Sequence, residues 1–275
     1  MPRPTLPAMG IDTHIADYDW NAALAALAWQ VEMGVTEVMV EAAVDRYALP
    51  EKQEPVVPKP GAKPKPEAVQ DLPKADPVQV AKAAAAPCSD LASLRAALEA
   101  FDHCELKKGA RNLVFADGNP AAPLMIIGEA PGRDEDLEGR PFVGTSGQLL
   151  DKMLAAIGHG RRAEDARKAA YITNVMPWRP PGNRDPSEDE IAMMRPFLER
   201  HIALVKPRVI IAMGNTSCMA LFGKSSVLRL RGTWETAQGI PVMPMAHPGH
   251  LLRNPAAKRE AWADLLDVQA RMRQS

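Results

Sequence analysis

Three polar side chains follow three short apolar runs of this chain, and together they could form a reactive site. Glu129 follows the run at 124–128, Asn174 ends the run at 170–174, and His247 follows the run at 240–245. If these runs are parallel strands of one sheet, their carboxyl ends meet at the edge where open α/β sheets bind ligands. The sequence therefore predicts a site that combines a carboxylate, a carboxamide and an imidazole.

The segment after the first run is rich in glycine and proline, from Gly128 to Gly147. Such residues let the backbone turn sharply and approach a ligand closely. A helical spacing of apolar residues resumes only at Leu149, so we expect the loop to line the site, with Phe142 offering an aromatic face. The loop also carries four carboxylates that we expect to be mostly solvated, because runs of charge usually are. They are Asp134, Glu135, Asp136 and Glu138.

Three longer segments carry a resemblance to a known family. They read GEAPGRDEDLEGRPFVGTSGQLL at 128–150, TNVMPWRPPGNRDP at 173–186 and HPGHLLRNP at 247–255. In this order and spacing, the chain resembles the family 4 branch of the uracil-DNA glycosylase superfamily over about residues 101–270. Each short match is weak alone, but the set is specific. The resemblance implies a monofunctional DNA glycosylase that hydrolyses the N-glycosidic bond of uracil in DNA, leaving an abasic site for base excision repair.

The resemblance also implies a role for each residue of the site. Phe142 resembles the aromatic that stacks on a uracil flipped out of the helix, and Asn174 would read N3–H and O4 of that base. Ala130 belongs to the same uracil-binding set. His247 would donate to uracil O2 as negative charge develops, and Glu129 would position water or face the positively charged sugar.

These residues also have purely structural explanations on sequence alone. Phe142 could be a core phenylalanine, Asn174 could cap a turn before Pro177, and His247 could be an isolated core or surface imidazole. Pro248 restricts the backbone of His247 to an extended conformation, which favours a ring aimed at the site.

Two loops are expected to face DNA, at 179–184 and 249–253. Their arginines would bind phosphates, which gives affinity without sequence preference. Other side chains of the second loop would fill the gap left by the flipped base, although a core position is an alternative for Leu252. The phosphate-binding candidates are Arg179, Arg184 and Arg253, and the wedge candidates are His250, Leu251 and Leu252.

The chain departs from the family at the cysteines that bind an iron–sulfur cluster. The four family positions match Phe101, Cys104, Trp178 and Met194, so three of the four ligands are missing. One thiolate cannot hold such a cluster. We therefore expect no cluster, no other metal and no cofactor.

Two further differences concern the loops. Gly249 replaces a serine of the family, which excludes any role for that hydroxyl. The segment 175–190 lacks the basic, histidine-containing insertion of a related branch that becomes covalently attached to DNA. We expect repeated turnover instead of covalent attachment.

Two other functions are alternatives to this prediction. The first is a non-catalytic binder of uracil-containing or abasic DNA. The second is an enzyme that acts on small nucleotides, but the chain lacks the GxGxxG and GxxxxGK(S/T) spacings of phosphate loops. The sequence leaves open whether single- or double-stranded DNA is preferred and whether hypoxanthine or xanthine is also removed.

The elements that must position these residues follow from hydrophobic patterning. Apolar runs predict strands at 123–128, 170–175, 208–213 and 240–245, and amphipathic patterns predict helices at 146–157, 187–204, 215–222 and 256–273. Alternation of strands and helices indicates a parallel sheet that is covered on both faces. The predicted fold is a three-layer α/β/α sandwich on a four-stranded parallel sheet, as in the family.

The chain divides into three parts by composition. Residues 1–49 predict a helical extension, and residues 50–87 hold nine of the 26 prolines, which is typical of a disordered linker. The catalytic domain is then expected over 88–275. The N-terminal part would be a simple tether or a docking module for a repair or replication partner.

Charge and cysteine content are consistent with a protein that binds DNA transiently. The net charge is −1, but residues 88–275 carry 25 Lys and Arg against 22 Asp and Glu, and 18 of those cations are arginine. Three cysteines without a CxxC spacing point to a reducing cytosol. Because neither a signal peptide nor a membrane-spanning run is found, we expect a cytoplasmic protein that associates with the nucleoid through DNA. We also expect a monomer.

Overall fold

The computed structural model describes residues 76–274, so the predicted helical extension and the linker up to residue 75 lie outside the described residues. Helix α2 (Pro77–Ala85) begins at an N-cap aspartate, Asp76, and buries Ala81 and Ala85 against helix α7 (Glu188–Val205). The prediction of a linker is therefore wrong for its last part, because residues 77–85 belong to the folded unit.

Four parallel strands form the centre of the sheet, in the order β3-β2-β4-β6. They are β2 (Leu124–Gly128), β3 (Ala170–Asn174), β4 (Val209–Met213) and β6 (Ile240–Met245). Each differs from its predicted bounds by at most one residue. The register pairs Gly128 with Asn174, which places the carboxyl ends of β2 and β3 side by side.

Two short antiparallel strands extend the sheet at its edges. Strand β1 (Ala116–Gly118) pairs with β3, and strand β5 (Glu235–Ala237) pairs with β6. The prediction of a four-stranded parallel sheet is therefore wrong in detail, since the sheet is mixed and has six strands in the order β1-β3-β2-β4-β6-β5. Strands of three residues with little apolar character carry no alternation that sequence reading could detect.

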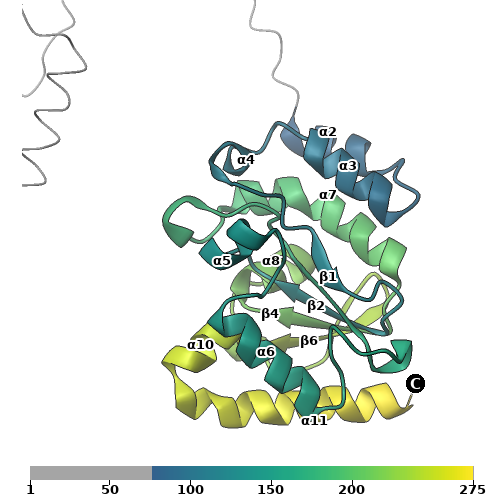
Figure 1. Cartoon of the computed structure of the whole chain (residues 1–275), viewed down its shortest axis with the longest axis vertical. Coiled ribbons are helices and arrows are strands. Elements are labelled where there is room, and N and C mark those ends of the chain that lie inside the picture. Colours follow the sequence, from purple (N-terminus) through teal and green to yellow (C-terminus); the bar gives the residue numbers. More distant parts are fainter. Residues whose placement is uncertain (1–75, 275) are drawn as a thin grey trace, which may run out of the picture. The chain divides into compact units, whose positions relative to one another are not determined.

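Helices cover both faces of the sheet, as predicted, and Figure 1 shows the sheet between two helical layers. Met125 and Ile127 point to the layer that contains α2 and α7, whereas Leu124 and Ile126 point to the opposite layer. The first layer also holds α3 (Leu91–Ala100) and α8 (Asn215–Phe222). The second holds α6 (Thr145–Ala156), α10 (Pro248–Arg253) and α11 (Lys258–Gln274).

The remaining helices within residues 76–274 are short and lie in the connections. They are α4 (Leu106–Gly109), α5 (Arg133–Glu138) and α9 (Val227–Leu230), with 3₁₀ turns at Ala166–Lys168, Pro181–Asn183 and Pro255–Ala257.

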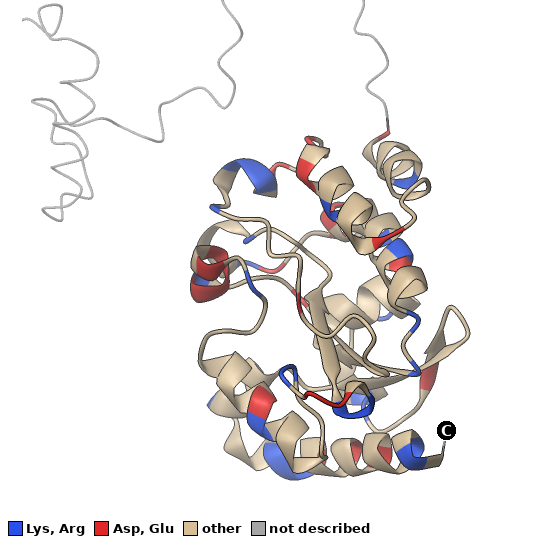
Figure 2. Cartoon of the chain, turned by 45° about the vertical axis from the view of Figure 1, so that its right-hand side comes forward, with Lys and Arg blue, Asp and Glu red and all other residues tan. Residues whose placement is uncertain are grey.

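Helix α5 corrects the prediction of a loop with solvated charges. Its acidic residues stand out in Figure 2, but Glu135 and Asp136 are buried. The Glu135 carboxylate accepts hydrogen bonds from the backbone amides of Val143 and Gly144, and Asp136 accepts two backbone amides from the segment before β1. Hydrogen bonds from amides compensate these carboxylates for the loss of water.

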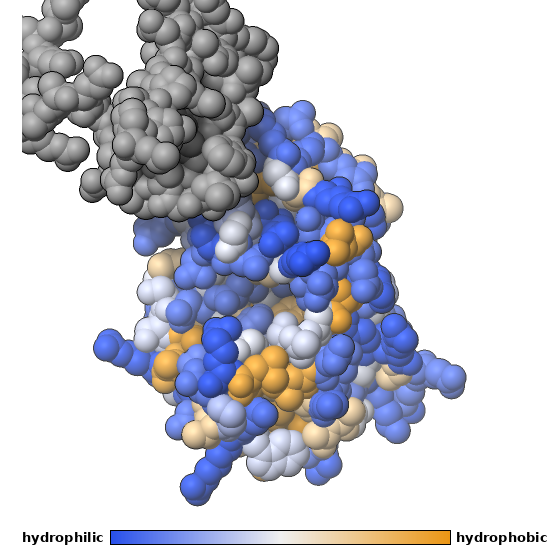
Figure 3. Space-filling model, turned by 60° about the vertical axis from the view of Figure 1, so that its left-hand side comes forward, coloured by the Kyte–Doolittle hydropathy of each residue, from blue (hydrophilic) through white to orange (hydrophobic). Residues whose placement is uncertain are grey.

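The surface combines charged residues with a few apolar patches. On the face shown in Figure 3, apolar patches lie among hydrophilic residues. Between α6, α10 and α11 lies an apolar groove of about 290 Å³, and Trp262 and Leu266 on α11 are also exposed. No helix within residues 76–274 is both long and apolar enough to span a membrane.

Candidate active site

The residues predicted to form the site lie around one cavity at the carboxyl ends of the parallel strands. Glu129 follows β2, Asn174 ends β3 and His247 follows β6, and all three line a cavity of about 540 Å³ together with Ala130 and Phe142. The predicted convergence at this edge of the sheet is confirmed. A second cavity of about 520 Å³ also has Glu129 and His247 in its lining.

The carboxylate of Glu129 is held by the turn between β4 and α8. Its Oε1 accepts a hydrogen bond of 2.9 Å from the backbone N–H of Thr216 in the first turn of α8. Gly214 makes this approach possible, since its φ of 98° is unfavourable for other residues and any Cβ there would overlap the Glu129 side chain. The structure thus fixes Glu129 between the two cavities.

The imidazole of His247 has a defined tautomer. His247 is the N-cap of α10, and its Nδ1 accepts a hydrogen bond of 3.1 Å from the backbone N–H of Gly249. Burial lowers the pKa of His247 below its ordinary value, and the nearby Glu129 carboxylate opposes this only in part. The neutral ring therefore carries its proton on Nε2, which becomes a hydrogen-bond donor.

Phe142 and Asn174 lie against the end of β2. A Cβ at Gly128 would overlap both the Asn174 Oδ1 and the Phe142 ring, so only glycine allows this close approach. The Phe142 ring lies 5.5 Å from the His247 ring, centroid to centroid, at an interplanar angle of 30°. Phe142 is thus both buried and part of the cavity wall, and Asn174 lines the same cavity as a carboxamide.

The arginines predicted to bind phosphates differ in their positions. Arg253 is exposed and lines both cavities, while Arg184 lines the first and forms hydrogen bonds of 2.6 and 2.9 Å with Glu190. Arg179 is bonded to Asn183 and lines neither cavity. The structure therefore brings two of the three cations to the site.

The candidate wedge residues on α10 are separated by the helix. Leu251 is 1% exposed and packs in the core against α6 and α11, so its prediction as a DNA-contacting residue is wrong. Leu252 is 43% exposed and lines the first cavity, which also excludes the core position considered for it. Neighbouring residues on a helix point in directions about 100° apart, so only one leucine can face the cavity. His250 lines the second cavity.

Some residues of the site were not predicted from sequence. Gly214 and Thr216, which hold Glu129, follow strand β4, and their place at a strand end was the available signal. Arg161 and Glu135, which contact the loop around Phe142, were missed because nothing in the sequence marks their partners.

The four residues that the resemblance places at iron–sulfur ligand positions do not fit such a cluster. All four side chains are buried in one apolar cluster; they are Phe101, Cys104, Trp178 and Met194. Burial raises the pKa of the Cys104 thiol, whereas binding of iron requires a thiolate. Within residues 76–274, no three His, Cys, Asp or Glu side chains are grouped as a metal site.

Comparisons with known proteins give matches over the same part of the chain. The family model of the uracil DNA glycosylase superfamily matches residues 115–266. A type-4 uracil-DNA glycosylase of Saccharolobus solfataricus is 41% identical over 175 residues, which are 60% of this chain and 79% of that protein. The type-4 uracil-DNA glycosylase of Archaeoglobus fulgidus is 38% identical over 60% of this chain and 84% of that protein. The one of Thermotoga maritima is 39% identical over 55% of this chain and 77% of that protein.

Proposed function

The chain belongs to the uracil-DNA glycosylase superfamily, and on this premise we propose that it hydrolyses the N-glycosidic bond of uracil in DNA and leaves an abasic site. The observation that carries the proposal is the convergence of Glu129, Asn174, His247 and Phe142 on one cavity. Cleavage of this bond places positive charge on the sugar and negative charge on the departing base, so the site must stabilise both.

His247 and Glu129 are suited to these two charges. The Nε2–H of a neutral imidazole donates a hydrogen bond to O2 of uracil, and this bond strengthens as the base becomes an anion. The Glu129 carboxylate, fixed by the Thr216 amide, faces the sugar or positions the attacking water. Both act in a cavity from which a flipped base would exclude much of the water.

Recognition of the base is assigned to Asn174, Phe142 and Ala130. The carboxamide of Asn174 accepts from N3–H and donates to O4 of uracil, and cytosine has the opposite pattern at both atoms. The Phe142 ring supports the face of the base. Because the bond is inaccessible in an intact duplex, the base must leave the helix to enter the cavity.

The DNA strand is held by the rim of the cavity. Arg253 and Arg184 are placed to contact phosphates, and Leu252 is placed to fill the gap that the flipped base leaves. The phosphate contacts do not depend on sequence and apply to single- and double-stranded DNA, whereas the wedge acts only in a duplex.

We also propose that the enzyme works without an iron–sulfur cluster. Phe101, Trp178 and Met194 fill the three positions where the resemblance expects cysteine, and they pack with Cys104 in the core. Purified protein is expected to be colourless and free of iron and sulfide. Stoichiometric iron and acid-labile sulfide would contradict this part of the proposal.

The proposed activity is tested with an end-labelled oligonucleotide that contains one uracil. Incubation followed by alkali should cleave the strand at that position only, and a thymine control should stay intact. Retained binding without cleavage would instead favour the non-catalytic alternative.

Two variants test the assigned roles. Glu129→Gln and His247→Ala should each slow single-turnover excision by at least tenfold, about 1.4 kcal/mol, while DNA binding changes little. The exposed residues Glu138 and His103 supply the matched controls Glu138→Gln and His103→Ala. Variant rates equal to those of the controls would remove Glu129 and His247 from the mechanism.

A further inference from the structure

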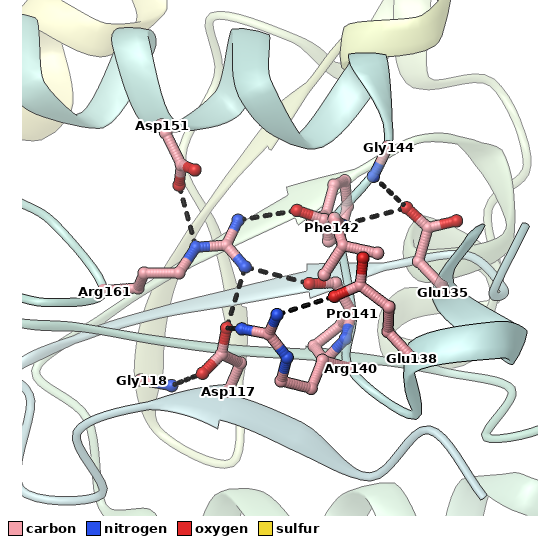
Figure 4. Close-up of polar contacts among 11 residues, drawn as sticks. Asp117, Gly118, Glu135, Glu138, Arg140, Pro141, Phe142, Gly144, Asp151 and Arg161 are labelled. Carbon is pink, nitrogen blue, oxygen red and sulfur yellow. Dashed lines mark hydrogen bonds and ion pairs between the residues drawn. The ribbon is translucent and has the colours of Figure 1, made fainter. Parts of the chain in front are cut away.

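Arg161 lies at the centre of a hydrogen-bond network behind the active-site loop (Figure 4). Its side chain is only 7% exposed and donates to the backbone carbonyl oxygens of Pro141 and Phe142, at 2.9 Å each. It also pairs with Asp151 of α6 at 2.8 Å and with Asp117 of β1 at 3.0 Å. One guanidinium thus ties the Phe142 turn to two elements of the fold.

The same turn is held from its other side by a carboxylate. The Glu135 Oε1 accepts hydrogen bonds of 3.0 Å from the backbone amides of Val143 and Gly144, the two residues after Phe142. Ionic groups therefore bind both the carbonyl oxygens of residues 141 and 142 and the amides of residues 143 and 144.

Phe142 needs such support because its backbone is strained. Its φ of 54° lies in the left-handed region, which residues with a side chain rarely adopt. A strained residue persists only where the surrounding structure holds it, and such residues gather at functional sites. Helix α6 adds to the support, since a Cβ at Gly147 would overlap the Phe142 carbonyl.

The shape of arginine is essential to this arrangement. Its planar fork directs several N–H groups at once, whereas a lysine ammonium is a single point charge. Arg140 lies in the same network and pairs with Glu138 at 2.6 Å and Asp117 at 3.7 Å. Within the described residues, no hydrogen bond joins the Arg140 guanidinium to the turn carbonyls, which makes Arg140 a natural control.

We propose that Arg161 is a positioning residue for uracil excision, which acts by holding the Phe142 turn so that the ring forms the wall of the base cavity. This inference rests on the proposed function. It predicts that the effect of Arg161 on excision passes through the Phe142 ring and disappears when that ring is absent.

A double-mutant cycle on the full chain tests this coupling. Relative to wild type, Arg161→Lys should slow single-turnover excision about tenfold. Relative to Phe142→Ala alone, the double variant should be slower by less than twofold. The matched control Arg140→Lys should stay within twofold of wild type in both backgrounds. An equal loss in the two backgrounds, or no loss from Arg161→Lys, would overturn the inference.

Two further measurements keep the test decisive. If Arg161→Lys does not fold, Asp151→Asn removes one support of the guanidinium from a residue that is half exposed, and a smaller loss with the same dependence on Phe142 is expected. Fluorine NMR of protein labelled with fluorophenylalanine reports the Phe142 ring among five phenylalanines without any need for activity. The Phe142 signal should shift in Arg161→Lys and not in Arg140→Lys.

These readouts separate the two proposals. If the wild type shows no excision but the Phe142 signal still shifts in Arg161→Lys, only the proposed function is contradicted. If the wild type is active but the Phe142 signal is unchanged in Arg161→Lys, only the positioning role is contradicted.

Discussion

Two adjacent leucines on α10 should have opposite roles, and replacing each by alanine separates stability from DNA handling. Leu251 is packed in the core that α10 shares with α6 and α11, whereas Leu252 lies on the rim of the base cavity. Leu251→Ala should therefore destabilise the fold, and Leu252→Ala should leave the fold intact and impair excision from duplex DNA.

The expected magnitudes follow from burial. Leu251 is 1% exposed, so its truncation should lower the free energy of unfolding by about 2–5 kcal/mol, the range for buried leucines. Leu252 is 43% exposed, and its truncation should change that free energy by no more than about 0.5 kcal/mol. A missing wedge leaves the gap in the duplex unfilled, which should slow excision about tenfold, or about 1.4 kcal/mol.

Urea unfolding and single-turnover excision on matched single- and double-stranded oligonucleotides measure both effects. A single strand has no base stack to restore, so Leu252→Ala should lose much less activity there. Equal slowing of both substrates by Leu252→Ala would contradict its role as a wedge. Unfolding of Leu251→Ala at the same urea concentration as wild type would contradict the contribution of Leu251 to the core.

Three further predictions concern acid stability, base recognition and domain boundaries. Burial lowers the pKa of His201 to about 4, so the unfolded state binds more protons below pH 6.5 and stability is lost as the pH falls. Between pH 7 and pH 5, His201 should therefore lower the free energy of unfolding by about 2 kcal/mol. In urea titrations, His201→Gln should remove this pH-dependent loss of stability. Asn174→Asp should lose uracil excision and gain a trace of cytosine release, measured on paired oligonucleotides; unchanged uracil excision would show that Asn174 does not read the base. Deletion of residues 1–75 should leave an active core with an unchanged melting temperature, whereas deletion of 1–87 also removes α2 and should lower it; equal melting temperatures would contradict the packing of α2.

The central sheet and the site could be predicted because their signals are local. Each parallel strand is a short apolar run between turn residues, and being buried on both faces it needs no alternation of polar residues. The carboxyl ends of such strands must meet, so Glu129, Asn174 and His247 could be brought together from their order alone.

What could not be predicted depends on contacts between distant segments. The burial of Glu135 depends on amides of a turn eight and nine residues away, and that of Arg161 depends on carbonyls about twenty residues away. The choice between Leu251 and Leu252 depends on the rotation of α10, which is set where His247 caps that helix. Strands β1 and β5 exist only because a neighbouring strand pairs with them.

The most direct test of the account is to count the uracil that each protein molecule releases. With uracil-containing DNA in large excess, chromatography should find free uracil and abasic sites in equal amounts, and many of each per molecule of protein. Undiminished DNA binding with no free uracil would contradict the account, because the protein would then bind the lesion without catalysis. Release that stops at one uracil per protein would contradict the proposed turnover.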